Sequence, residues 1–192
     1  MRNTMNYYAM KKNLPIRNCT EFDGKFETIP MDEDWKESIK SRVWAKNYTG
    51  PQKLNADYAK LRDILLGFGG EEVCFAHNEA DLQDILQYGQ LWDGRGRIIT
   101  KYGRACGCHA NSAKVWFKSG AYERFEKGEE NNLTIATGYA LSEDGMWRQH
   151  SWIVQRKPRS YNIIETTTKR IAYFGIALSD ERCVKFAMEN QW

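Results

Sequence analysis

The apolar residues of this chain change from a helical to an extended pattern partway along its length, which limits the folds open to it. Near the start, Trp35, Ile39 and Val43 recur at i, i+4 and i+8, the spacing of one helix face. After residue 130, runs rich in β-branched and aromatic residues predict strands over residues 133–141 and 146–154. Helices followed by neighbouring antiparallel strands predict an α+β fold.

Local signals divide the chain further. The first half is expected to hold helices over residues 32–44, 55–66, 78–88 and 111–119, a strand over 71–76 and a loop over 92–104. Asn78 is the expected N-cap of the third helix. The second half is expected to hold strands over 133–141, 146–154, 161–168 and 171–176 and a last helix capped by Ser179. Residues 142–145, Ser-Glu-Asp-Gly, predict a hairpin turn.

The length and composition predict one domain with an extension. The chain has 192 residues, of which 42% are hydrophobic and 13% aromatic, enough for a sizeable core. Residues 1–30 are polar and lack periodicity, so we expect an N-terminal arm there. Residues 31–192 then form a single domain, with a helical half over about 31–120, a β half over about 130–178 and a C-terminal helix over about 179–190.

Charge, hydropathy and cysteine content exclude several classes of protein. The formal net charge of +3 is spread along the chain and lacks the clustered basic signature of nucleic-acid binders. No apolar run approaches the roughly 18 residues of a membrane span, and the first residues lack a secretory h-region. The five cysteines are an odd number and are expected to be free thiols. We therefore expect a cytoplasmic protein with no membrane partner.

The segment Cys106-Gly107-Cys108-His109 places a thiol directly before an expected helix. A helix N-terminus favours the thiolate, and its unpaired N–H groups can stabilise an oxyanion. Cys108 is favoured over Cys106 as the nucleophile because it lies nearer the helix, and His109 becomes a neighbour rather than the base. The alternative is that both cysteines are small core residues.

Two further residues could complete a catalytic constellation. His150 lies in one expected strand and Glu165 in the next, 15 residues on, about the separation that neighbouring antiparallel strands require. The imidazole would serve as the base and the carboxylate would fix its tautomer. The alternatives are a core histidine with satisfied hydrogen bonds and a charge at a strand end that faces solvent.

A zinc site is the competing interpretation. The pairs Cys74 with His77 and Cys106 with Cys108, with His109 in reserve, are ligands of acceptable types. The spacing between Cys106 and Cys108 is shorter than usual and the pairs come from unrelated elements, so we expect no metal and no cofactor.

The cysteine segment and the order of the three residues resemble the papain-like cysteine peptidases and the broader papain and transglutaminase superfamily. The local signature there is C-G-[SA]-C-[WY]; here one residue is missing and His109 replaces the aromatic. The resemblance covers roughly residues 100–176. Cys108 and His150 are 42 residues apart, against about 130 in papain, which points to a compact member.

The resemblance implies a papain-like fold in which the nucleophile helix packs on a C-terminal antiparallel sheet. It also implies a Cys108–His150–Glu165 triad that forms a thioester with a protein or peptide-like amide substrate. Neutral His150 would accept the Cys108 proton, and water or an amine would resolve the acyl-enzyme. The papain oxyanion glutamine has no counterpart, since Tyr102 lies at the sixth position before Cys108. The candidate oxyanion or substrate-binding residues are Gln149, Gln90, Trp152 and Asn111. The alternatives are an inactive binding or inhibitory protein on the same scaffold and the zinc-stabilised module.

Overall fold

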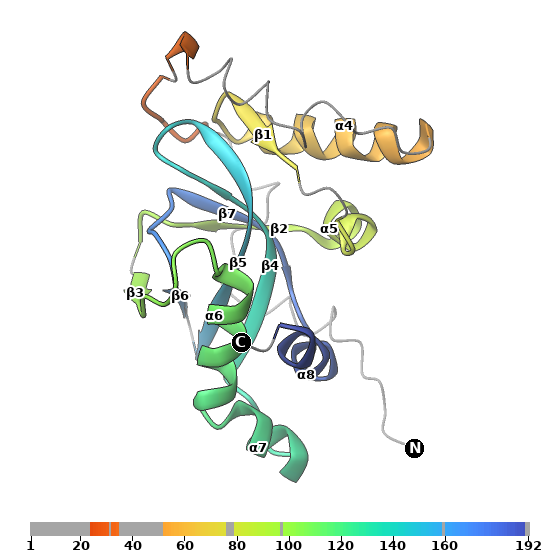
Figure 1. Ribbon diagram of the computed structural model, residues 1–192, viewed down its shortest axis with the longest axis vertical. Helices are drawn as coiled ribbons and strands as arrows, with labels where there is room; N and C mark the ends of the chain where they lie inside the picture. Colours follow the sequence, from red (N-terminus) through yellow and green to blue (C-terminus); the bar gives the residue numbers. More distant parts are fainter. Residues whose placement is uncertain are drawn as a thin grey trace.

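A curled sheet of seven strands runs through the described part of the chain (Figure 1). The computed structural model describes residues 24–30, 32–34, 52–75, 79–96, 98–158 and 160–190. The strands are β1 (Glu72–Cys74), β2 (Gln90–Asp93), β3 (Ile98–Thr100), β4 (Leu133–Leu141), β5 (Met146–Lys157), β6 (Ser160–Glu165) and β7 (Ala172–Ala177). The helices are α4 (Gln52–Gly67), α5 (Leu82–Tyr88), α6 (Cys108–Lys118), α7 (Ala121–Lys127) and α8 (Asp180–Glu189).

The strand order is β2-β7-β4-β5-β6-β3, with β1 joined to β5 outside this path. The four strands β4 to β7 form an antiparallel group, and β3 and β1 add to it in parallel. With helices packed against this sheet, the protein has an α+β fold.

Strand β5 pairs with one long strand, β4, along one edge and with two shorter strands, β1 and β6, along the other. Along one edge β4 pairs with β5 from Trp147 to Gln155. On the other edge β1 pairs with residues 146–148, and β6 pairs only from Ile153 onward. Residues 149–152 therefore have no partner strand on that edge among the described residues, and helix α6 begins beside this gap.

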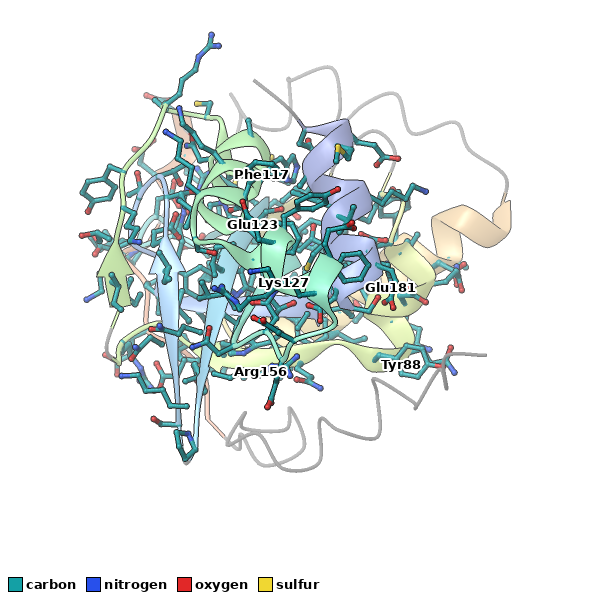
Figure 2. The ribbon with its side chains drawn as sticks, turned by 90° about the horizontal axis from the view of Figure 1, so that it is seen from below. Tyr88, Phe117, Glu123, Lys127, Arg156 and Glu181 are labelled. Carbon is teal, nitrogen blue, oxygen red and sulfur yellow. The ribbon has the colours of Figure 1, made fainter. Side chains whose placement is uncertain are left out.

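Helices α6 and α8 lie side by side on one face of the central strands (Figures 1 and 2). All nine residues of β4 are buried, because the sheet is covered on both faces. The core on the α6 side includes the fully buried Trp116 and Ile135. The opposite face holds a second apolar cluster built around Trp92, Trp152 and Tyr173, whose rings pack edge to face or tilted. The side chains of residues 149–151 of β5 therefore point alternately to the apolar cluster on the α6 side of the sheet and to the cluster on the opposite face.

Much of the expected arrangement of elements is confirmed. The helix over 55–66 is part of α4, and the hairpin of β4 and β5 turns at residues 142–145. Ser179 caps α8 by accepting a hydrogen bond from the Arg182 N–H at 3.3 Å. The strand expected over 71–76 is shortened to β1, and α5 follows Asp81 as its N-cap. Asn78 lies outside the described residues, as does most of the helix expected over 32–44.

Three expectations are wrong. The glycine- and arginine-rich segment 92–104, expected as a loop, supplies half of β2 and all of β3. The reason is tertiary: Leu91 and Trp92 are buried by pairing with β7 rather than by any local pattern. Helix α6 begins at Cys108, three residues earlier than expected, and α7 was not expected at all.

The end of the expected N-terminal arm is packed onto the fold. Phe26 is 3% exposed, forms an isolated parallel bridge with Gly69, and lies under the guanidinium of Arg95 at 4.8 Å. The N–H of Ile29 donates to the carbonyl of Glu143 at 2.8 Å. Residues 1–23 lie outside the described residues. None of the helices that the structure describes is both long and apolar enough to cross a membrane.

Gly138 on β4 and Gly175 on β7 are register partners at a point of close approach. A Cβ at Gly138 would lie 2.6 Å from the Cα of Gly175, and the φ of Gly138 is +153°. We expect Gly138→Ala to lower the free energy of unfolding by at least about 2 kcal/mol, because the backbones would have to separate. Urea denaturation measures this.

Gly67→Ala is the matched control, since no atom lies within 4 Å of a Cβ there and Gly67 ends a helix. It should leave stability unchanged or raise it by up to about 1 kcal/mol. Equal effects of the two substitutions would contradict the packing argument.

Candidate active site

The first turn of α6 is bound to Ser151, the residue in the middle of the open β5 edge. The Ser112 hydroxyl donates to the Ser151 carbonyl at 3.1 Å, and His109 Nδ1 lies 2.6 Å from the Ser151 hydroxyl. The backbone of Ser151 also interacts with the thiol of Cys108. A neighbouring strand would have used these backbone groups, so the gap between β1 and β6 is what lets the helix approach.

Cys108 is the first residue of α6, and Gly107 is its N-cap. The carbonyl of Gly107 accepts the first helical hydrogen bond, from Asn111 at 2.8 Å. The N–H of Cys108 belongs to the first turn, where a helix has no acceptor of its own for these groups. The thiol is half-buried at this positive helix end, a setting that favours its ionised form.

His150 joins the cysteine to a carboxylate. Its Nε2 lies 2.9 Å and 3.1 Å from the two oxygens of Glu165, and both residues are almost fully buried. The His150 ring also interacts with the side chain of Cys108. Because Nε2 is engaged by Glu165, Nδ1 is the nitrogen available to the thiol. The structure thus brings together all three residues expected from the sequence.

The carboxylate of Glu165 is held by several donors besides His150. Oε1 accepts from the N–H groups of Thr166 and Thr167, both at 2.8 Å, and from the Thr167 hydroxyl at 3.0 Å. Oε2 accepts from the hydroxyl of Tyr173 at 2.9 Å. These bonds fix the carboxylate and, through it, the plane of the His150 ring.

The pKa values of Cys108, His150 and Glu165 are all shifted, and each shift is caused in part by a neighbouring member of the three. Burial acts to raise the pKa of Cys108, but the His150 ring and the N–H groups of Ser151 and His109 outweigh it and lower that pKa. Burial acts to lower the pKa of His150, but Cys108 and Glu165 raise it to about 9. The pKa of Glu165 is lowered despite burial, chiefly by His150. Both shifts act in the direction that favours the charged forms, a thiolate and an imidazolium, whereas the expectation from the sequence is a neutral His150.

Aromatic rings hold the imidazole from its buried side. The ring of Trp152 is stacked on that of His150, with centroids 6.2 Å apart and an interplanar angle of 15°. Tyr173 lies 6.1 Å from the same ring. Trp152, a candidate substrate-binding residue, is 0% exposed, so its role in this structure is to pack against the histidine.

Asn111 positions the loop that leads into the cysteine. Its side-chain carbonyl accepts from the Arg104 N–H at 3.0 Å, and its amide donates to the carbonyls of Arg104 and Thr166 at 2.8 and 3.3 Å. Gly103 also donates to the Thr166 carbonyl. Asn111 is buried and bridges the loop to the end of β6, beside Glu165.

The two glutamines considered as oxyanion donors have other surroundings. Gln149 points to the opposite face of β5 from His150, where its amide donates to Glu79 at 3.0 Å. Gln90 lies on β2, three strands from β5, and its buried carbonyl has no hydrogen-bond partner. Neither side chain hydrogen-bonds Cys108 among the described residues, although Gln149 also interacts with the ring of His109. His109 faces Ser151 and Phe186, so its position as a neighbour rather than the base agrees with the geometry.

The residues considered as zinc ligands form no cluster that the structure describes. No group of three or more His, Cys, Asp or Glu side chains among the described residues could hold a metal ion. His77 lies outside the described residues. Cys74, Cys106, Cys108 and Cys183 are all free thiols.

Sequence reasoning missed the residues that support the triad. Tyr173 is the most important of them, because its phenol donates to Glu165 from β7. Thr166 and Thr167 directly follow a carboxylate at the end of an apolar strand, a run of donors that could have indicated a buried acid. Tyr173 has no such local signal, since only the sheet order brings it close.

Comparison with protein-family models, with curated proteins and with solved structures finds no match to this chain.

The reactivity of Cys108 should depend on His150. In the wild-type protein, iodoacetamide should modify Cys108 readily at pH 7, because the thiolate persists below the usual thiol pKa. In His150→Ala, the largest interaction that offsets burial is lost and only the backbones of Ser151 and His109 still lower the thiol pKa, so this pKa rises. The rate at pH 7 should then fall at least about tenfold and recover at alkaline pH. Peptide-mapped alkylation rates across pH measure this.

Cys106→Ser is the control, and modification at Cys108 should continue in it. Cys183 should stay unmodified, because burial raises its pKa to about 12. Rapid labelling of Cys74 or Cys106 with an inert Cys108 would contradict the assignment.

Proposed function

We propose that this protein is a thiol-dependent hydrolase or acyl transferase that acts on amide or peptide bonds. Cys108 is the nucleophile, His150 the proton carrier and Glu165 the group that orients it. The observation that supports this most directly is the buried His150 ring, which interacts with the Cys108 side chain and hydrogen-bonds the carboxylate of Glu165.

The first half of the reaction uses the ion pair. The Cys108 thiolate adds to the carbonyl carbon and forms a C–S bond, while the π pair of the carbonyl moves to its oxygen. When this intermediate collapses, the C=O bond forms again and the C–N bond breaks. His150 gives its Nδ1 proton to the departing nitrogen, which leaves a thioester, a free amine and a neutral imidazole.

The second half restores the enzyme. Neutral His150 takes a proton from water or from an acceptor amine, whose oxygen or nitrogen adds to the thioester carbon. The C–S bond then breaks and the Cys108 thiolate is regenerated beside the imidazolium. Water as acceptor gives hydrolysis or deamidation, and an amine gives transfer. Glu165 stays ionised throughout and stabilises the imidazolium.

The first turn of α6 supplies a donor for the oxyanion. The N–H of Cys108 has no acceptor within the helix and belongs to the same residue as the attacking sulfur. With the positive end of the helix dipole, it would favour negative charge on the substrate oxygen. We propose this group in place of Gln149 or Gln90.

The arrangement supports the resemblance to papain-like and transglutaminase-like enzymes. A helix that begins with the cysteine lies against an antiparallel sheet that carries the histidine and the carboxylate on adjacent strands. The four free cysteines that the structure describes are compatible with a reducing compartment such as the cytoplasm.

A peptide vinyl sulfone tests the nucleophile without knowledge of the natural substrate. Intact mass should show one adduct on the wild-type protein, no adduct on Cys108→Ala and slow addition to His150→Ala. The rate of adduct formation should be high at pH values between the lowered pKa of Cys108 and the raised pKa of His150. Turnover of an amide substrate should decline as pH rises through about 9, because the imidazolium that protonates the leaving group is then lost. A reactive Cys108→Ala protein would refute the proposal, and an inert wild-type thiol would favour a binding protein on this scaffold.

The support of the imidazole is tested by a graded pair of substitutions. Glu165→Gln removes the negative charge and places an amide NH2 group where the carboxylate accepts hydrogen bonds. We therefore expect kcat/KM to fall by about 100-fold or more. Tyr173→Phe removes one hydrogen bond to the carboxylate and should cost about tenfold. Thermal unfolding of each variant separates loss of catalysis from loss of fold. Equal activity of wild type and Glu165→Gln at matched folded fractions would exclude the orienting role.

A further inference from the structure

A cleft of about 930 Å³ lies along the exposed side of α6 and is lined by Cys106 and Gly107, the two residues before Cys108. We call it the basic cleft; it is lined by residues 101–107, Ala110, Asn111, Lys114, Val115, Lys118 and Ser119. Cys108 itself does not line the cleft, but Gly107 directly precedes it, so one end of the cleft lies at the start of the helix that carries the nucleophile. The cleft is separate from the buried His150 and Glu165, which do not line it.

Positive charge dominates the lining of this cleft. Lys101, Arg104, Lys114 and Lys118 contribute four cationic side chains, and all four residues are exposed. None of the described residues that line the cleft is acidic. Among the described residues, Lys101, Arg104 and Lys118 form no ion pair. Elsewhere on the described surface, by contrast, arginines such as Arg95 and Arg182 are paired with aspartates.

The cleft is long enough for an extended peptide, and part of its lining is apolar. The α6 residues that line it recur at spacings of three and four, so they form one continuous helix face. From Gly107 to Ser119 the helix rises by about 18 Å, at about 1.5 Å per residue. An extended peptide of about five residues covers that length. Ala110 and Val115 give an apolar floor, and Tyr102, 66% exposed, is the aromatic group on the rim.

We propose that the basic cleft binds an acidic peptide segment on one side of the bond that Cys108 attacks. This inference rests on the proposed function and names its substrate class: a protein or peptide with carboxylates within about five residues of the reacting amide. Glutamate or aspartate side chains would pair with the cations along α6 while the backbone lies over the apolar floor. Such pairing provides specificity and faster association more than raw affinity.

A single-stranded nucleic acid is the other polyanion that a basic cleft could take. The cleft offers one exposed aromatic ring, Tyr102, where nucleic-acid grooves use several for base stacking. The neighbouring triad also performs chemistry on an amide carbonyl, which nucleic acid does not offer along its backbone. The observations therefore favour the acidic peptide.

Binding to the Cys108→Ala protein tests this proposal directly, because no turnover occurs there. The probes are fluorescein-labelled peptides with three consecutive glutamates placed before or after a central Ala-Gly bond, each matched by a peptide with three glutamines. Fluorescence anisotropy should show that at least one glutamate peptide binds about tenfold more tightly than its glutamine partner, since each exposed charge pair contributes roughly twofold. The difference should shrink when salt rises from ~0.05 M to ~0.5 M.

Charge reversal locates the site. In the Cys108→Ala background, Lys101→Glu, Arg104→Glu and Lys118→Glu together should abolish the preference for glutamate. The control combines Lys60→Glu, Lys127→Glu and Lys157→Glu, which changes the net charge equally at exposed positions outside the cleft (Lys127 is labelled in Figure 2). The control should keep most of the preference. Glutamine at Lys101, Arg104 and Lys118 gives a milder variant if the reversal prevents folding.

The outcomes separate this proposal from the proposed function. Equal binding of glutamate and glutamine peptides, or equal loss in the cleft and control variants, overturns the cleft assignment even if Cys108 reacts with the vinyl sulfone. Binding of a labelled oligothymidylate that depends on the cleft residues, without binding of either glutamate peptide, also overturns it. Glutamate-specific binding with an inert Cys108 would support the cleft and refute the catalytic proposal.

Discussion

The candidate site depends on a carboxylate that stays ionised in the interior. Glu165 is 0% exposed, and an isolated charge at such a depth would cost several kcal/mol. Its two oxygens instead accept hydrogen bonds from Thr166, Thr167, Tyr173 and His150, which replace the lost hydration. The pKa of His150 is then raised by Cys108 and by this negative charge, and the imidazole in turn lowers the pKa of Cys108. The shifts of the cysteine and the histidine depend on each other, and the carboxylate supports both.

The sheet makes room for this chain of interactions by an incomplete edge. Strand β1 leaves β5 at Arg148 and β6 joins it only at Ile153, so the backbone of Ser151 remains available. Its carbonyl accepts a hydrogen bond from Ser112 of helix α6, and its backbone interacts with the thiol of Cys108. The alternation of β5 then places Ser151 toward the helix and His150 toward the aromatic cluster on the other face. Cys108, at the helix tip in the gap, can reach the histidine although the two belong to different layers.

The sequence predicts the three reacting side chains better than their surroundings. Cys108, His150 and Glu165 stand out because thiol, imidazole and carboxylate occur next to a helix start and within strand-like runs, which are local patterns. The β4–β5 hairpin is predicted for the same reason, since its strands and its Ser-Glu-Asp-Gly turn are contiguous. Tyr173 could not be assigned to Glu165, because its contact depends on β7 curling back beside β4. Strands β2 and β3 were likewise missed, since tertiary pairing rather than local alternation makes Leu91 and Ile99 extended.

The rim of the basic cleft and the carboxylate of the triad share a set of hydrogen bonds. The N–H of Lys101 donates to the carbonyl of Glu165, and Gly103 donates to that of Thr166. Asn111 closes the set by bonding both Arg104 and Thr166 from within the cysteine helix. The loop that carries Lys101 and Arg104 is therefore hydrogen-bonded, backbone to backbone, to the end of the strand that holds Glu165. Any displacement of this loop must be transmitted to the strand end or break these bonds, so the geometry of the cleft and that of the imidazole are set by the same few contacts.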